Sequence, residues 1–156
     1  MSIAWNEVRG REIIDRHAGR EGSLLPILHD LQATFACIPP EAVPVVAEVL
    51  NLTRAEVHGV VSFYHDFRNR PAGRHVLKLC RAEACQSMGG EAMARRALDH
   101  FGLEWGGTTP DGNLTVEATY CLGLCASGPS AMLDGEPIGR LRPASLDDIA
   151  REVAVR

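Results

Sequence analysis

Apolar residues recur at helical spacing through the first 66 residues of the chain. One stripe consists of Leu24, Leu28, Leu31 and Phe35, and it follows Ser23, a residue that can cap a helix. A short helix of this kind draws most of its stability from burying its apolar face. The stripe therefore predicts a helix that packs against a neighbour.

Two further helices are expected between the Pro39-Pro40 break and residue 66. Their apolar positions are Val43, Val46, Ala47 and Leu50 in the first, and Val57, Val60, Val61 and Tyr64 in the second. The first helix ends at Asn51-Leu52, and Thr53 with Glu56 forms a capping box that begins the second. Because short helices with one apolar face bury those faces against one another, we expect an N-terminal helical bundle over residues 1–68.

The pattern changes after a polar linker at residues 68–73, which Pro71 and Gly73 interrupt. The elements expected beyond it are a strand at 75–79 that ends at Cys80, a helix from Gly90 to about Phe101, strands at 114–120, 131–133 and 138–141, and a helix capped by Ser145 with Asp148. Asp111-Gly112 and Asp134-Gly135 supply turns. The order β-α-β-β-β-α predicts an α/β (α+β) domain over residues 74–156.

Composition narrows the class of protein. The 156 residues are 46% apolar and 23% charged, which is ordinary for a globular chain and excludes disorder, collagen and coiled coil. Acidic residues exceed basic ones by 20 to 16 without a basic face, so a nucleic-acid partner has little support. No apolar run approaches the ~20 residues of a membrane span, and the N-terminus lacks the apolar core of a signal peptide. We therefore expect a soluble, cytoplasmic protein.

The cysteines carry the candidate chemistry. In a cytoplasmic protein, cysteines are metal ligands or reactive thiols more often than disulfides. Four of the five form two close pairs, Cys80-x4-Cys85 and Cys121-x3-Cys125, and each pair follows the end of an expected strand. Two loops at one edge of the sheet could thus present four thiolates to a single centre. Cys37 precedes Ile38-Pro39-Pro40 and is interpreted as a small buried residue.

Spacing favours a two-iron cluster, in which each pair holds one iron, and leaves zinc and reactive thiols as alternatives. Zinc ribbons generally use Cys-x2-Cys, a spacing that neither pair has. Rieske ligation needs histidines near the first cysteine of each pair, and those positions hold Ala82, Glu83, Gly123 and Leu124. A thioredoxin-type dithiol would also need Cys-x2-Cys.

The residues around the cysteines resemble a known family. Residues 79–87 (LCRAEACQS) and 120–125 (YCLGLC) resemble the thioredoxin-like [2Fe–2S] ferredoxin family, which includes the small flavin-side subunit of respiratory complex I. Residues 24–29 (LLPILH) and 62–67 (SFYHDF) extend the likeness, which covers roughly residues 23–152. The RAEACQS form, with RAEVHG at 54–59, most resembles the gamma subunit of NAD-dependent, molybdenum-containing formate dehydrogenase. The complex I relatives usually carry a Thr- and Pro-containing insert between the first two cysteines, which this chain lacks.

This resemblance implies a thioredoxin-like fold and one [2Fe–2S] cluster whose ligands are Cys80, Cys85, Cys121 and Cys125. It also implies two partners: a flavin-binding diaphorase (beta) subunit, where NAD is reduced at FMN, and a molybdenum-containing catalytic (alpha) subunit. FMN, NAD and the molybdenum cofactor would then lie only on those partners.

The chain has no dinucleotide fingerprint, P-loop or nucleophile elbow, so we expect a non-catalytic electron-transfer subunit. The alternatives are the equivalent subunit of complex I or of an NAD-linked hydrogenase, and a free-standing ferredoxin. We expect residues 1–68 to dock the flavin subunit, because a bare ferredoxin would not need them; the alternative is that these helices only cover one face of the ferredoxin domain.

Overall fold

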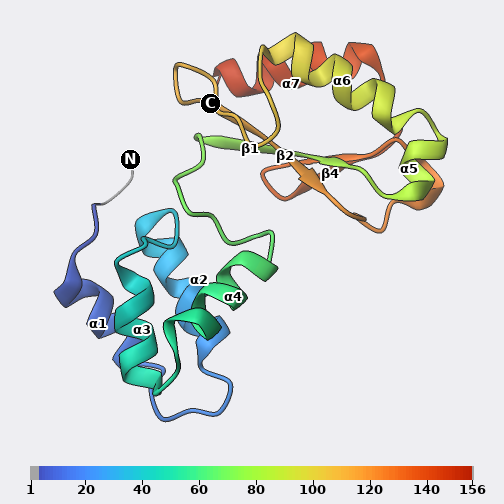
Figure 1. Cartoon of the computed structure of the whole chain (residues 1–156). Helices are drawn as coiled ribbons and strands as arrows, with labels where there is room; N and C mark the ends of the chain where they lie inside the picture. Colours follow the sequence, from blue (N-terminus) through green and yellow to red (C-terminus); the bar gives the residue numbers. More distant parts are fainter. Residues whose placement is uncertain (1–3, 156) are drawn as a thin grey trace. The chain divides into compact units, whose positions relative to one another are not determined.

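The computed structural model describes residues 4–155, and the chain divides into two units, Met1–Pro71 and Ala72–Arg156 (Figure 1). Each unit has a hydrophobic core of its own. The first core is built from residues between Ile13 and Phe67, and the second from residues between Leu77 and Val153. No helix among residues 4–155 is both long and apolar enough to cross a membrane.

The described part of the first unit is helical, as the sequence predicts. Its helices are α1 (Glu7–Asp15), α2 (Leu24–Phe35), α3 (Ala42–Leu50) and α4 (Arg54–Phe63). The capping box is present: Thr53 Oγ1 accepts a hydrogen bond from the Glu56 backbone N–H at 3.2 Å, and Glu56 Oε2 accepts one from the Thr53 N–H at 2.8 Å. Asn51 ends α3 in the left-handed conformation, with φ of 51°.

Two details of this unit differ from the expectation. Ser23 lies at the N-cap position of α2, but its backbone is already helical and its side chain makes no capping hydrogen bond. In α3 the fully buried positions are Ala42 and Val46, whereas Val43 and Leu50 are half-buried. The buried face of α3 therefore differs from the predicted stripe: Val45 belongs to it together with Ala42 and Val46.

The second unit is a mixed sheet with helices. Its elements are β1 (His75–Cys80), α5 (Glu83–Ser87), α6 (Gly90–Phe101), β2 (Leu114–Thr119), the 3-10 turn η1 (Cys125–Ser127), β3 (Ala131–Leu133), β4 (Glu136–Ile138) and α7 (Pro143–Val155). The strand order is β2-β1-β3-β4. β1 is parallel to β2 and antiparallel to β3, and β3 is antiparallel to β4. This agrees with the predicted α/β class.

Helices α6 and α7 lie along one face of this sheet (Figure 1). The core between them and the strands contains Leu77 and Val116 from the sheet, Ala97 from α6 and Leu146 from α7, each at most 1% exposed. At roughly 1.5–3 kcal/mol for each large aliphatic side chain fully buried, this core gives the second unit its own source of stability.

Two boundaries in this unit correct the expectation. Asp134 and Gly135 both have positive φ, 51° and 91°, so they form a two-residue turn and β4 begins at once at Glu136, not at Ile138. The closing helix begins at Pro143, which suits the first helical position because it lacks an N–H. Ser145 lies inside the first turn, where its Oγ accepts a hydrogen bond from the Arg142 N–H at 3.1 Å.

Candidate metal centre

The sheet register brings the two cysteine loops to the same edge. β1 and β2 run parallel with Cys80 opposite Thr119, so both strands end at the same level. The chain after β1 is tied to the last residue of β2 by a 2.8 Å hydrogen bond from the Arg81 N–H to the Thr119 carbonyl. Cys121 then lies two residues beyond the end of β2. The predicted meeting of the two loops is therefore present.

Cys80 and Cys85 form a buried pair. Their exposed fractions are 4% and 2%. Cys85 lies on α5, and Gly90 at the start of α6 packs directly on its backbone: a Cβ on Gly90 would lie 2.6 Å from the Cys85 carbonyl oxygen. The loop before α5 is held by a hydrogen bond of 2.6 Å from Gln86 Nε2 to the Arg81 carbonyl. Cys85 therefore lies where α5 packs closely against the first residue of α6.

Cys121 and Cys125 form an exposed pair on the loop that follows β2. Cys121 has φ of 88°, a conformation that a non-glycine residue adopts only at a cost of order 1–3 kcal/mol, so the surrounding loop must hold it. Its Sγ accepts a hydrogen bond of 3.4 Å from the Gly123 N–H. Gly123 itself has φ of 75°, which makes glycine the residue suited to this turn.

Hydrogen bonds converge on the Cys80 sulfur. Burial opposes ionisation of this thiol, but hydrogen bonds outweigh burial and hold its pKa below the usual cysteine value. The donors are the backbone N–H groups of Ala82, Cys121 and Leu122 and the thiol of Cys85. The thiolate is the form of cysteine that binds metal ions, so these donors prepare Cys80 for that task.

The pKa of Cys125 is shifted in the opposite direction. A hydrogen bond with Cys121 and the negative charge of Cys121 raise it, and the charges of Cys85 and Cys80 add to the rise. The four sulfurs are therefore close enough to influence one another's ionisation. Four thiolates at such a place repel one another unless cations lie between them, which is what a metal centre provides.

The grouping of the sulfurs is two and two. Cys80 hydrogen-bonds with Cys85, and Cys121 with Cys125. Within residues 4–155, no three His, Cys, Asp or Glu side chains are placed so as to hold one metal ion. A two-iron cluster does not require three such side chains around one metal ion, because each pair of thiolates can hold one iron. The donor set and the N–H groups directed at its sulfurs thus fit a cluster of net negative charge.

Cys37 lies elsewhere, in the first unit. It is 8% exposed, and burial is the main reason that its pKa is raised. A buried, protonated thiol outside the cysteine loops matches its interpretation as a packing residue.

Sequence reasoning missed Ser130, whose hydroxyl lies 3.4 Å from Cys85 Sγ in the interior. Its spacing from the cysteines matches no motif. The sequence feature that could have indicated it is its position directly before β3, because β3 pairs with β1, the strand that ends at Cys80.

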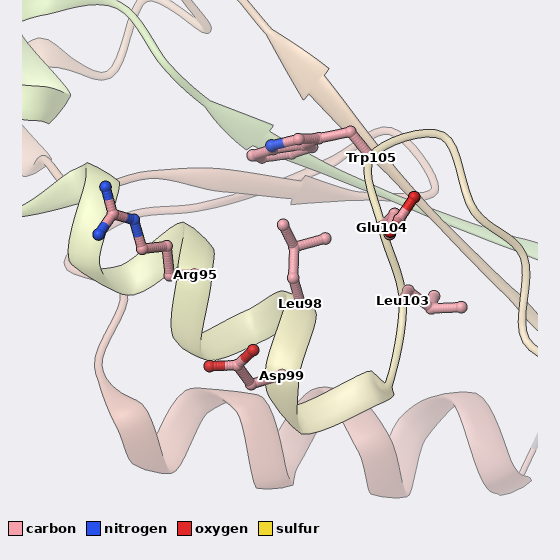
Figure 2. Close-up of a pocket in the computed structure, with 6 residues that line it drawn as sticks. All are labelled: Arg95, Leu98, Asp99, Leu103, Glu104 and Trp105. Atoms are coloured by element: carbon pink, nitrogen blue, oxygen red, sulfur yellow. The ribbon is translucent and has the colours of Figure 1, made fainter.

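A separate groove of about 460 Å³ lies beside α6, with lining residues Arg95, Leu98, Asp99, Leu103, Glu104 and Trp105 (Figure 2). Figure 2 shows Leu98 directed from α6 toward the Trp105 ring. The Arg81 guanidinium carbon lies 5.1 Å from the centre of that ring, and Arg81 Nη2 is 3.3 Å from Glu91 Oε2. The contact between Arg81 and Trp105 joins the loop after α6 to the residue that follows β1. No cysteine lines the groove, so the groove is separate from the cysteine loops.

Three comparisons place the chain among known proteins. The family model described as thioredoxin-like [2Fe–2S] ferredoxin matches residues 10–154. One subunit of the NADH-quinone oxidoreductase of Mycobacterium tuberculosis is 35% identical over 147 residues, which cover 94% of this chain and 58% of that protein. The NADP-reducing hydrogenase subunit HndA of Solidesulfovibrio fructosivorans is 30% identical over 141 residues, covering 90% of this chain and 82% of that protein.

The fold resembles part of a chain in the crystal structure of an air-oxidised NAD+-reducing [NiFe]-hydrogenase. The TM-score is 0.70 at 25% sequence identity, over 91% of this chain and 24% of that chain. The chain thus spans somewhat more than half of the mycobacterial relative and a quarter of the hydrogenase chain. The family match over nearly the whole sequence confirms both the thioredoxin-like fold and the [2Fe–2S] cofactor class, and the chain belongs to the thioredoxin-like [2Fe–2S] ferredoxin family.

Proposed function

We propose that Cys80, Cys85, Cys121 and Cys125 hold one [2Fe–2S] cluster and that the chain is an electron-transfer subunit of an NAD-linked oxidoreductase. The observation that carries this proposal is the meeting of two thiol pairs at one sheet edge, with backbone N–H groups directed at their sulfurs. A bound cluster of this kind accepts and releases one electron at a time.

The residues around the sulfurs have distinct tasks. Cys80 and Cys85 are shielded from water, so their side of the centre lies in a medium of low polarity. The N–H groups of Ala82, Leu122 and Gly123 offset negative charge on the sulfurs. The exposed pair leaves one edge of the centre open to another protein, which an electron carrier requires.

Exposed apolar side chains beside the open edge support a redox partner. Met88 is 60% exposed and Tyr120 is 61% exposed, and they are the exposed large hydrophobic side chains of the described part of the second unit. Tyr120 directly precedes Cys121, and Met88 Cγ would lie 3.5 Å from a Cβ on Gly128, close to the second cysteine loop. We propose that a flavin-binding subunit covers this edge, because clustered exposed apolar residues mark interaction sites.

The first unit adds a second surface. Phe63 is 74% and Tyr64 44% exposed at the end of α4, beside a groove of about 580 Å³ that Leu24, Leu52 and Val60 help to line. We propose that residues 1–68 dock the same flavin subunit through this surface.

The five free cysteines also support a cytoplasmic location, where thiols stay reduced.

For the parent complex we propose an NAD-dependent formate dehydrogenase, with a molybdenum-containing catalytic subunit beyond the flavin subunit. The support is the RAEACQS run at 81–87 and the lack of a Thr- and Pro-containing insert between the first two cysteines. The relatives in NADH-quinone oxidoreductase and NADP-reducing hydrogenase favour a second candidate, the equivalent subunit of one of those complexes.

Metal analysis tests the cluster. The purified chain should contain iron and acid-labile sulfide in equal amounts, two of each per chain, and an S = 1/2 EPR signal should develop on reduction with dithionite. Stoichiometric zinc without sulfide would refute the proposal.

Purification of the intact complex tests its identity. We expect molybdenum and flavin to co-purify with the chain, and formate to reduce the cluster in the absence of NADH. Nickel with reduction by hydrogen would assign the complex to the hydrogenases. Reduction by NADH alone, with quinone as the acceptor, would assign it to the complex I class.

Truncation tests the docking role of the first unit. A chain of residues 72–156 retains the whole second core and all four proposed ligands. We expect it to fold and keep its cluster but to lose co-purification with the flavin subunit. Undiminished binding would contradict the docking role, and loss of the cluster would show that the helices serve instead to protect the second unit.

A further inference from the structure

We propose that Ser130 sets the reduction potential of the centre by donating a hydrogen bond to the Cys85 thiolate. Ser130 Oγ lies 3.4 Å from Cys85 Sγ, and the two residues are each 2% exposed. The inference rests on the proposed ligand set, in which Cys85 binds iron. It assigns to a residue outside the cysteine motifs a specific effect on that centre.

The direction of the hydrogen bond follows from ligation. In the free protein either the thiol or the hydroxyl can donate. A thiolate bound to iron has no proton, so the serine hydroxyl must then be the donor. The described structure gives this hydroxyl no other hydrogen-bond partner.

The backbone holds the hydroxyl in place. The Ser130 carbonyl accepts a hydrogen bond of 3.0 Å from the Cys80 N–H, and the next residue, Ala131, pairs with Leu79 across the β1–β3 ladder. Gly128, two residues before Ser130, also lies beside Cys85, since a Cβ on Gly128 would be in van der Waals contact with Cys85 Sγ at 3.6 Å. Ser130 is therefore fixed by the sheet at the buried side of the thiol pair.

Reduction adds one negative charge to the centre, and part of it resides on the ligating sulfurs. A hydrogen bond to a more negative acceptor is stronger, particularly where water is excluded. The Ser130 hydroxyl thus stabilises the reduced form more than the oxidised form and raises the potential. Ser130 is a positioning and tuning residue; the ligands remain the four cysteines.

The test is the midpoint potential of the full chain with Ser130→Ala, measured by EPR-monitored redox titration. We expect the ratio of reduced to oxidised protein at a fixed potential to fall about tenfold, which for a one-electron couple is about 59 mV toward more negative potential. Iron and sulfide content should be unchanged. Ser87→Ala is the matched control, because its hydroxyl lies on the same short helix as Cys85 but donates to the Ala84 carbonyl at 2.9 Å.

An unchanged potential in Ser130→Ala, or an equal shift in Ser87→Ala, would overturn the inference. Loss of the cluster from Ser130→Ala would also overturn it, since the hydroxyl would then hold the site together and not tune it. Ser130→Thr retains a hydroxyl, and a protein with this change that holds its cluster should keep the parent potential. Failure of the unaltered chain to contain iron and sulfide would instead refute the ligand set itself.

Discussion

The contact between Gly90 and Cys85 predicts that Gly90→Ala disturbs the metal centre through backbone crowding. A Cβ at this position would lie 2.6 Å from the Cys85 carbonyl oxygen and 2.9 Å from its carbonyl carbon. Both are main-chain atoms, which cannot rotate away as a flexible side chain would. Relief of the overlap therefore requires α5 to move relative to α6, and Cys85 moves with α5.

The magnitude follows from the size of the overlap. Inserting a methyl group into a packed site typically costs about 1–3 kcal/mol. For a unit of this size, each kcal/mol lowers the melting temperature by roughly 4–8 °C. We expect Gly90→Ala to melt roughly 4–24 °C below the parent chain in circular dichroism and to retain less iron after purification.

The adjacent Gly89 supplies a control that separates crowding from general instability. Gly89 has φ of 86° with nothing within 4 Å of a Cβ, so Gly89→Ala introduces only backbone strain, of about 1–2 kcal/mol. It should lower the melting temperature while leaving the iron content intact. Equal iron loss in both variants, or a Gly90→Ala protein that matches the parent in melting temperature and iron, would refute the reasoning.

Two further predictions concern the first unit. Thr53→Ala removes the cap of α4 and should cost about 1 kcal/mol in urea unfolding. Hydrogen bonds from the Thr53 backbone and side chain lower the pKa of Glu56. The Glu56 carboxylate therefore contributes stability above the usual glutamate pKa, and this contribution is lost as the pH falls through the lowered pKa. A destabilisation by Thr53→Ala that is as large at pH 2 as at pH 7 would contradict this. Cys37→Ser should leave the iron content and the visible spectrum unchanged. Cys121→Ser should lower the iron content and bleach or strongly alter the spectrum, because serine is a harder ligand for iron. Equal losses in the two variants would show that the ligand set is wrong.

The convergence of the cysteine loops could be predicted because it needs little beyond strand order. Cys80 is the last residue of β1 and Cys121 lies two residues beyond β2, and parallel neighbours end at one edge of a sheet. The unequal burial of Cys80 and Cys121 could not be predicted in this way. It depends on where α5 packs and on the positive φ of Cys121, which result from tertiary contacts of Gly90 and the loop after β2.

Contacts between residues distant in sequence account for other features that the sequence pattern did not predict. The sequence pattern identifies Asp134 only as a turn residue. In the structure its carboxylate also accepts a hydrogen bond of 2.8 Å from the Val76 N–H and lies 2.6 Å from His75 Nδ1. These partners are 58 and 59 residues away, so no local pattern reveals them. The same holds for Ser130 and Cys85, which are 45 residues apart.

The two sides of the centre have different physical tasks because they have different neighbours. On the side of Cys85, the sulfur and the Ser130 hydroxyl are both buried, and we have proposed that their hydrogen bond raises the potential. On the side of Cys121, both cysteines of the pair are exposed, and the nearby side chains of Met88 and Tyr120 are 60% and 61% exposed. A partner that covers those two side chains also removes water from the exposed sulfurs, which disfavours the more highly charged reduced form. Docking of a partner at the Cys121 side would therefore lower the reduction potential, whereas the hydrogen bond from Ser130 at the buried side would still raise it.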